Sequence, residues 1–188
     1  HYMQRVAIQG SPNMITSITN NYQPGSTGSK TNVHPFKISF NALEIGNQIV
    51  TKKRLITSED IDKFADLSGD HFYAHNKTTN FEGTMFTQQV AHGYFIMSAA
   101  AGLFVDDDKL GPVLLNYGID ELRFTKPVYP GSEIYVRFTC KEKIVQDKKE
   151  ITDIDKGIVK WLVEMIDETN ELTGIATILT MVAKKPVQ

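Results

Sequence analysis

The sequence of 188 residues has a single cysteine, little net charge and no long hydrophobic run. Because Cys140 has no second thiol to pair with, an internal disulfide and a paired-thiolate metal site are excluded, which is typical of a reducing compartment and favours the cytoplasm. Lysine and arginine total 20 against 22 acidic residues, so the net charge of -2 indicates neither a nucleic-acid partner nor an anionic membrane surface as a partner.

The most apolar stretch runs from Gly93 to Val105 and is too short for a transmembrane helix, which needs about 20 consecutive apolar residues. The start of the sequence also has no charged-then-apolar leader, so we expect neither a membrane partner nor an export signal. The hydrophobic content of 41% is typical of a chain that folds around a globular core.

Turn residues divide the sequence into two parts. In residues 1–33, proline, glycine, serine and asparagine interrupt both regular periodicities, and we interpret this part as an appendage and linker. From His34 onward, apolar segments alternate with turn residues at regular spacing, and there is no internal repeat. Residues 34–188 are therefore expected to form one domain.

Two segments are predicted to be helical. Thr57 and Asp60 form a capping box, and the apolar residues after them recur at helical spacing, which predicts an amphipathic helix from Ser58 to Leu67 that ends at Gly69. Tyr94 to Val105 is apolar on nearly every side. A helix without a polar face must be covered by other structure, so we expect this helix to be enclosed.

The second half of the sequence is predicted to consist of strands. Apolar and polar residues alternate in residues 133–140, which predicts a half-buried strand. Pro130 and Gly131 supply turn chemistry directly before it, so we predict that residues 118–124 pair with it in an antiparallel hairpin. Residues 157–167 and 172–183 are also predicted to be strands, although the apolar spacing in the first of them also suits a helix.

One enclosed helix followed by antiparallel strands predicts an α+β fold of the hot-dog type, in which an antiparallel sheet curls around a central helix. Such a sheet leaves part of the helix and one strand edge uncovered. We therefore expect subunits to pair edge to edge, in a homodimer or a higher homo-oligomer.

The densest group of ionisable residues lies in a loop after the first predicted helix, where Asp70 and His75 stand five residues apart. Adding water to an activated double bond requires a base that takes a proton from water and an acid that delivers one to the adjacent carbon. An imidazole titrates near neutrality, so His75 is predicted to accept the water proton while Asp70 orients the water. The alternative is that both residues only shape a turn, and spacing alone favours it.

His92 and Gly93 stand at the entrance to the second predicted helix, where the first amides lack partners and carry the positive end of the helix dipole. The Gly93 amide is a candidate donor to an oxyanion, and such a donor lowers a barrier by roughly 3 kcal/mol. His92 is a candidate binding residue, or only a ring that packs against the loop. Two further groups are not expected to be functional. Cys140 is interpreted as a buried hydrophobic residue. The basic residues Lys52 to Arg54, Arg123 and Lys126 are interpreted as charges exposed to solvent.

Ser68-Gly69-Asp70 with His75, together with Ala91-His92-Gly93, resembles the signature of the MaoC-like, R-specific enoyl-CoA hydratases. The resemblance implies hydration of an α,β-unsaturated coenzyme A thioester by Asp70 and His75. It also implies no metal and no separate cofactor, because coenzyme A is part of the substrate. Two positions between Asp70 and His75 depart from the signature, which argues against a simple straight-chain substrate.

A wider set of segments resembles one branch of this family, the C-terminal domains of bifunctional enzymes of phenylacetate degradation. The resemblance implies hydrolytic ring opening of oxepin-CoA, with Phe72 and Tyr73 shaping a pocket for the ring. Those enzymes also carry an N-terminal, NADP-dependent aldehyde dehydrogenase domain that acts on the semialdehyde product. The segments are Ser68 to His75, His92 to Phe95, Ser98 to Asp106, Asn116 to Gly118, Leu122 to Phe124, Pro127 to Val128 and Pro130 to Gly131.

Residues 1–33 fit the same branch, because His1 to Pro12 resembles the end of that dehydrogenase domain. We therefore interpret the chain as a fragment without the dehydrogenase domain, its NADP or its activity. Three alternatives stay open: an R-specific hydratase of straight-chain thioesters, a thioesterase that releases free coenzyme A, and a domain without chemistry that holds dehydrogenase domains together.

Overall fold

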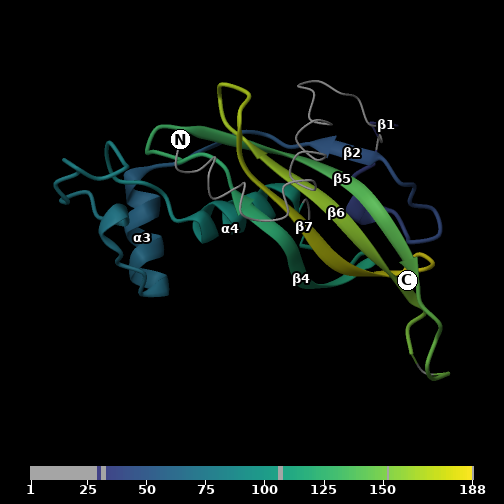
Figure 1. Ribbon diagram of the computed structural model, residues 1–188. Helices are drawn as coiled ribbons and strands as arrows, with labels where there is room; N and C mark the ends of the chain where they lie inside the picture. Colours follow the sequence, from purple (N-terminus) through teal and green to yellow (C-terminus); the bar gives the residue numbers. More distant parts are fainter. Residues whose placement is uncertain (1–28, 31–32, 106–107, 152, 188) are drawn as a thin grey trace.

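The computed structural model describes residues 29–30, 33–105, 108–151 and 153–187 (Figure 1). In chain order the elements are β1 (Ser29–Lys30), the 3-10 turn η1 (Pro35–Lys37), β2 (Asn47–Val50), β3 (Arg54–Leu55), α3 (Ser58–Ser68), the 3-10 turn η2 (Tyr73–His75), α4 (Gly93–Phe104), β4 (Val113–Phe124), β5 (Glu133–Val145), β6 (Lys156–Ile166) and β7 (Leu172–Ala183).

The described strands form one sheet in the order β1-β2-β5-β6-β7-β4, with β3 paired to β5. Neighbouring strands are antiparallel except β1 and β2, which are parallel. Figure 1 shows β5, β6 and β7 as a curved layer, with α4 along one of its faces and α3 at one end. The predicted α+β hot-dog fold is confirmed.

The central helix α4 packs against the sheet through aromatic rings. Phe104 of α4 stacks on Phe138 of β5 with 4.5 Å between the ring centroids, and Phe138 stacks on Trp161 of β6 at 4.7 Å. Each ring is at most 1% exposed, so this stack contributes a large share of the buried apolar area. The Trp161 Nε1 donates to Thr180 Oγ1 at 2.8 Å, which satisfies the one polar atom of the indole.

One side of α4 and one edge of the sheet are uncovered within the described residues, as predicted. Exposed positions recur every four residues on the helix, at Tyr94, Ser98 and Gly102. β4 pairs with β7 along one edge only, and no described strand pairs with its other edge. Exposed apolar side chains on β4 are Leu115, Tyr117 and Ile119.

α3 begins at Ser58, as the capping box predicts. The Asp60 amide donates to Thr57 Oγ1 and the Thr57 amide donates to Asp60 Oδ2, both at 3.1 Å, so two amides that the helix leaves free are satisfied. The helix ends at Ser68, one residue later than predicted, and Gly69 follows with a φ of 80°. Glycine adopts this left-handed conformation without strain, and it turns the chain out of α3 into the loop that carries Asp70.

The strand predictions for the C-terminal half are mostly confirmed. The alternating residues of β5 point into the core, and the ambiguous segment 157–167 is a strand, β6, whose alternate residues are buried. β7 has the predicted bounds. The core residues on β5 and β6 are Ile134, Val136, Phe138 and Cys140, and Val159, Trp161, Val163 and Met165.

The predicted hairpin between residues 118–124 and residues 133–140 is wrong. Residues 118–124 belong to β4, which pairs with β7 at the sheet edge, whereas both sides of β5 are occupied by β2, β3 and β6. Gly131 does turn the chain, with a φ of 96°, but its amide donates to Ile56 O beside β3. Turn residues identify where the chain reverses and leave the partner strand open.

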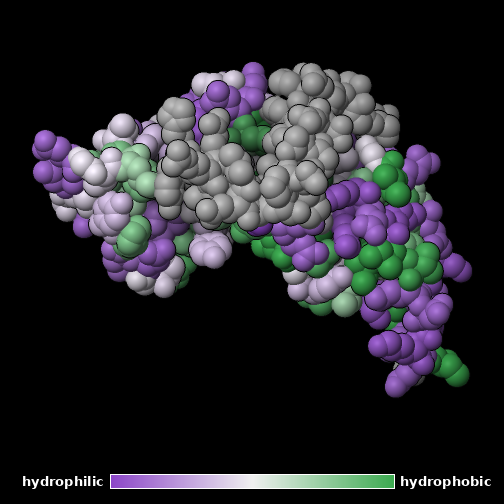
Figure 2. All heavy atoms as spheres, in the orientation of Figure 1, coloured by the Kyte–Doolittle hydropathy of each residue, from purple (hydrophilic) through white to green (hydrophobic). Residues whose placement is uncertain are grey.

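The connection between β5 and β6 extends beyond the rest of the sheet (Figure 1). In Figure 2 the end of this connection carries hydrophobic and hydrophilic residues side by side, and Ile151 within it is 95% exposed.

Among the described parts of the chain, none of the helices has the length and apolar composition needed to cross a lipid bilayer.

The predicted appendage and linker, residues 1–33, lies almost wholly outside the described residues. Within it, Ser29 and Lys30 form β1 beside Asn47 and Gln48 of β2. The division at residue 34 stays a prediction.

Candidate active site

Asp70 and His75 come together at the end of the loop after α3. Asp70 Oδ2 lies 3.9 Å from His75 Nε2, and the two side chains are 45% and 13% exposed. This separation is too long for a direct hydrogen bond but leaves each atom able to contact one shared water molecule. Asp70 therefore borders solvent while His75 lies behind it.

The His75 ring has a fixed orientation. Its Nδ1 lies 2.7 Å from the carbonyl oxygen of Val90. A carbonyl only accepts, so Nδ1 carries the hydrogen and Nε2 keeps its lone pair toward Asp70. The backbone of the same segment is held as well, because the Val90 amide donates to Ala74 O at 2.9 Å and Gln89 Nε2 donates to His75 O at 2.8 Å.

His92 packs against His75. The two rings are stacked with 3.6 Å between their centroids and 23° between their planes. His92 is 1% exposed, and its Nε2 lies 2.9 Å from the backbone oxygen of Asp70. Burial lowers the pKa of His92 and the neighbouring His75 acts in the same direction, against the hydrogen bond to Asp70, so its ring is neutral near pH 7. The ring thus contacts both predicted catalytic residues.

Gly93 is the first residue of α4, and its N-cap His92 makes no capping hydrogen bond through its side chain. The first amides of the helix are therefore available to a ligand. Gly93 and His75 line the same cavity, of about 150 Å³, together with Val128, Phe124 and Thr173. A Cβ atom on Gly93 would lie 2.3 Å from Phe124 Cε2, so a larger residue at this position would require the Phe124 ring to move.

Phe72 and Tyr73 lie beside His75 but outside that cavity. They are 59% and 41% exposed, and their rings contact each other with centroids 4.6 Å apart. The Phe72 ring centroid lies 6.3 Å from that of His75. These two residues therefore border the solvent side of His75.

The Asp70, His75 and His92 side chains are the group in the described residues whose ligand atoms lie close enough to share a metal ion, within 4.8 Å of one another. Two of the four ring nitrogens are occupied, because His92 Nε2 is bonded to Asp70 O and His75 Nδ1 to Val90 O. His75 Nε2 and His92 Nδ1 are left, on rings that are stacked with 23° between their planes. The predicted absence of a metal stays a prediction.

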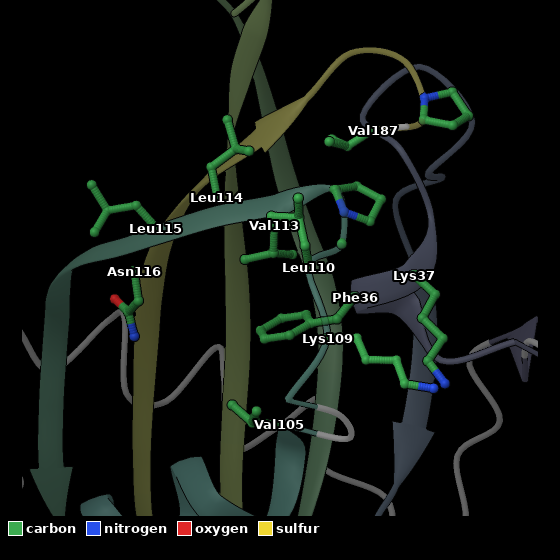
Figure 3. Close-up of a pocket in the computed structure, with 13 residues that line it drawn as sticks. Phe36, Lys37, Val105, Lys109, Leu110, Val113, Leu114, Leu115, Asn116 and Val187 are labelled. Carbon is green, nitrogen blue, oxygen red and sulfur yellow. The ribbon is translucent and has the colours of Figure 1, made fainter.

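A larger cavity, of about 540 Å³, lies at the other end of α4 and beside the start of β4 (Figure 3). In Figure 3 the Phe36 ring points into it, and Lys37 and Lys109 are among the residues that line it. A helix of twelve residues is about 18 Å long, so this cavity is separate from the one at Gly93. None of the predicted site residues lines it.

Of the basic residues interpreted as solvated, Lys52 and Lys53 are exposed, whereas Lys126 and Arg54 form ion pairs. Lys126, which lines the small cavity, forms an ion pair with the buried Asp167 at 2.5 Å and another with Glu171. Arg54 lies 3.7 Å from Asp60 and 5.4 Å from the Phe95 ring centroid. The buried Cys140 is confirmed, and burial raises the pKa of its thiol to about 11.

Several residues of the site have no signal in the sequence. Gln89 is 4% exposed and joins His75 O to Asp62 Oδ1, and it also accepts from Ser58 Oγ at 2.6 Å. Phe124 and Thr173 reach the cavity from β4 and β7. Their role depends on strand pairing, which residue spacing does not specify.

The fold and this geometry define a class of protein: a hot-dog domain with an aspartate and histidine pair beside the first turn of its central helix. A family model described as MaoC like domain matches residues 40–161, well over half of the chain. The chain therefore belongs to the MaoC-like domain family.

Two curated relatives and one solved structure illustrate the similarity. Protein MaoC of Klebsiella aerogenes is 46% identical over 149 residues, which are 79% of this chain and 44% of that protein. The 3-hydroxyacyl-thioester dehydratase Z of Mycobacterium tuberculosis is 32% identical over 84 residues, 42% of this chain and 54% of that protein. This chain thus matches only about half of each relative's length. The structure of a monoamine oxidase regulatory protein from Archaeoglobus has a TM-score of 0.71 and 26% identity, and the match covers 85% of this chain and 99% of that one.

Proposed function

We propose that this chain is a hydratase of α,β-unsaturated coenzyme A thioesters. The observation that carries the proposal is the 3.9 Å gap between Asp70 Oδ2 and His75 Nε2. His75 also lines a cavity together with Gly93, whereas Asp70 is not among the residues that line it. A gap of this length lets one water molecule lie about 2.8 Å from both atoms. Family membership supports the same class, and one relative is named a 3-hydroxyacyl-thioester dehydratase, which denotes the reverse reaction.

In the proposed mechanism, His75 Nε2 accepts a proton from the water while the water oxygen bonds to the β-carbon of the thioester. The electrons of the double bond move toward the thioester oxygen, and the Gly93 amide donates a hydrogen bond to the resulting enolate. A proton then returns to the α-carbon, with Asp70 orienting the water and sharing in the transfer. No covalent intermediate forms, so no serine or cysteine nucleophile is needed.

Within this class, we propose oxepin-CoA as the substrate, on the basis of the resemblance between residues 68–75, 92–95 and 98–106 and the phenylacetate-degradation branch. Water added at the β-carbon, which also bears the ring oxygen, gives a hemiketal. Its collapse breaks the carbon–oxygen bond of the ring, and the released enol tautomerises to an aldehyde. Phe72 and Tyr73 are proposed to face the ring, because they border the exposed side of His75.

We also propose that the active unit is at least a homodimer formed through β4. The cavity at His75 measures about 150 Å³, whereas pockets for small ligands usually measure at least about 300 Å³. A thioester with its pantetheine arm therefore needs a further wall. The free edge of β4 and its exposed apolar residues lie at the sheet border that a second copy would cover.

The test is the loss of ultraviolet absorbance when the purified chain is mixed with crotonyl-CoA or with oxepin-CoA. Asp70→Asn and His75→Ala are each expected to lower kcat by about 100-fold or more, because each removes one partner in proton transfer. The midpoint of thermal unfolding is expected to stay near the wild-type value in Asp70→Asn, since Asp70 is 45% exposed.

The sequence offers a matched control. Asp66 and His71 are also a carboxylate and an imidazole five residues apart, 3.7 Å from each other, but both are exposed. Asp66→Asn and His71→Ala are expected to leave kcat unchanged. Near-normal turnover in Asp70→Asn or His75→Ala would contradict the assigned roles. Turnover of crotonyl-CoA alone would favour the straight-chain alternative, and release of free thiol would indicate a thioesterase.

A further inference from the structure

His92 connects the exposed catalytic loop to the interior of the protein. Asp70 makes two local hydrogen bonds: its amide donates to Ser68 Oγ, and its Oδ1 accepts from the Phe72 amide. Each of these bonds joins residues only two positions apart. The bond from His92 Nε2 to Asp70 O, at 2.9 Å, spans 22 residues. It is therefore the contact that sets the position of Asp70 relative to the core.

His92 is itself held firmly. Its backbone oxygen accepts from the Ile96 amide at 3.1 Å as the first hydrogen bond of α4. The Phe64 ring of α3 packs edge-on against its imidazole, with centroids 4.9 Å apart. Two helices thus fix the ring that supports the loop.

The hydrogen-bond pattern also fixes the tautomer of His92. Because the Asp70 carbonyl only accepts, Nε2 carries the hydrogen, and Nδ1 is left buried without a partner. The same ring lies flat against His75 at 3.6 Å. One neutral imidazole therefore restrains the backbone of Asp70 and the ring plane of His75 at the same time.

We propose that His92 is a positioning residue, which holds Asp70 and His75 at the separation that lets them share one water molecule. The proposal deepens the proposed hydratase function and rests on it. His92 would not exchange a proton with the substrate, because it lies behind His75 and its Nε2 is occupied. Its effect would come through geometry, and a displacement of about 1 Å at a reacting group can cost about 100-fold in rate.

Three substitutions separate the two contacts. His92→Gln keeps an amide nitrogen near the Nε2 position, so the donor to Asp70 O remains. His92→Phe keeps a flat ring against His75 but has no donor. His92→Ala removes both contacts. If the hydrogen bond to Asp70 is the essential contact, kcat with crotonyl-CoA is expected to fall less than about 5-fold in His92→Gln, and by about 30- to 100-fold in the other two variants, with KM changed less than about 3-fold.

His71→Ala is the matched control, since it removes an exposed imidazole from the same loop. Amide hydrogen exchange of residues 69–73, measured on each variant without substrate, is expected to speed up in His92→Phe and His92→Ala only. If His92→Ala fails to fold, the comparison of the Gln and Phe variants still decides the result.

Two results would overturn the proposal. One is a kcat in His92→Phe within about twofold of the His71→Ala control. The other is unchanged amide exchange in the loop of His92→Phe. A wild-type chain that hydrates no thioester would instead refute the proposed function, while the exchange measurement would still show whether His92 restrains the loop.

Discussion

Gly93 has room for a side chain only if the Phe124 ring moves. A Cβ atom there would lie 2.3 to 2.6 Å from three ring atoms of Phe124. We expect Gly93→Ala to lower the free energy of unfolding by about 1–3 kcal/mol, because the ring must move in a packed region. It should also abolish hydration, because the methyl group occupies the cavity beside the proposed oxyanion donor. Urea unfolding and the absorbance assay measure the two effects.

The ring of Phe124 provides the control for this prediction. Phe124→Leu removes Cε2 and Cζ, two of the three ring atoms that clash, so the double variant with Gly93→Ala is expected to be more stable than Gly93→Ala alone. If the losses in unfolding free energy of the two single variants simply add in the double variant, the contact between Gly93 and Phe124 is not the cause of the destabilisation.

At the residue scale, the structure brings the predicted Asp70 and His75 close together, while their catalytic roles stay predictions. Asp70 and His75 are five residues apart in one loop. That spacing alone favours a simple turn, and it was the resemblance to the hydratase signature that singled the two residues out. The orientation of His75 depends on Val90 O, and the contact of His92 with Asp70 O spans 22 residues. No local pattern encodes either contact, which is why the supporting role of His92 emerges only from the fold.

At the scale of elements, local chemistry predicted α3 and β7 almost to the residue, because caps and alternation act within a few positions. The pairing of β4 was mispredicted, since Pro130 and Gly131 indicate a reversal without naming its partner. The β6–β7 connection shows the same limit. Asp167 in this connection accepts a hydrogen bond from Lys126, which follows β4 and lies 41 residues earlier in the chain.

The buried carboxylate Asp167 makes the β6–β7 connection sensitive to acid. Burial alone would raise its pKa, but hydrogen bonds from Lys126, Thr169 and the Glu171 amide outweigh burial and hold the pKa below its usual value of 3.8. The unfolded chain then binds the proton more readily, so this stabilisation is complete above about pH 4 and is lost as the pH falls through the lower folded-state pKa. We expect Asp167→Asn to cost about 1–3 kcal/mol at pH 7 and to flatten the acid side of the stability profile.

Denaturant unfolding at several pH values between neutral and strongly acidic checks this expectation. Asp155→Asn is the comparison, because Asp155 also pairs with a lysine, Lys184, but its side chain is 49% exposed. Solvent screens such a pair, so its removal is expected to change stability little. An Asp167→Asn profile parallel to that of the wild type at every pH would refute the prediction.

At the scale of the whole molecule, the uncovered border followed from the sequence, because one sheet cannot surround a helix. The residues that form this border could not be predicted from the sequence, because they depend on which strand lies at the edge. β4 places Leu115, Tyr117 and Ile119 there, with 51%, 41% and 46% of each residue exposed. A cytoplasmic location and the division at residue 34 stay predictions.

Ile119→Lys tests whether a second copy covers β4. A charge in the middle of this edge would have to be buried against the partner, and edge lysines are a common means of blocking strand pairing. We expect the wild-type chain to sediment as a dimer at micromolar concentration. The variant should be largely monomeric and should lose most of its hydratase activity, because each small cavity would lack its remaining wall.

Ile151→Lys is the matched control, because it places the same charge on the 95% exposed residue of the β5–β6 connection, away from β4. It should leave both sedimentation and turnover unchanged, since no partner is expected on that connection. A wild-type chain that is monomeric and fully active would show that the site needs no second copy. An Ile119→Lys dimer as stable as the wild type would place the subunit contact elsewhere, and the exposed stripe of Tyr94, Ser98 and Gly102 on α4 would then be the next surface to test.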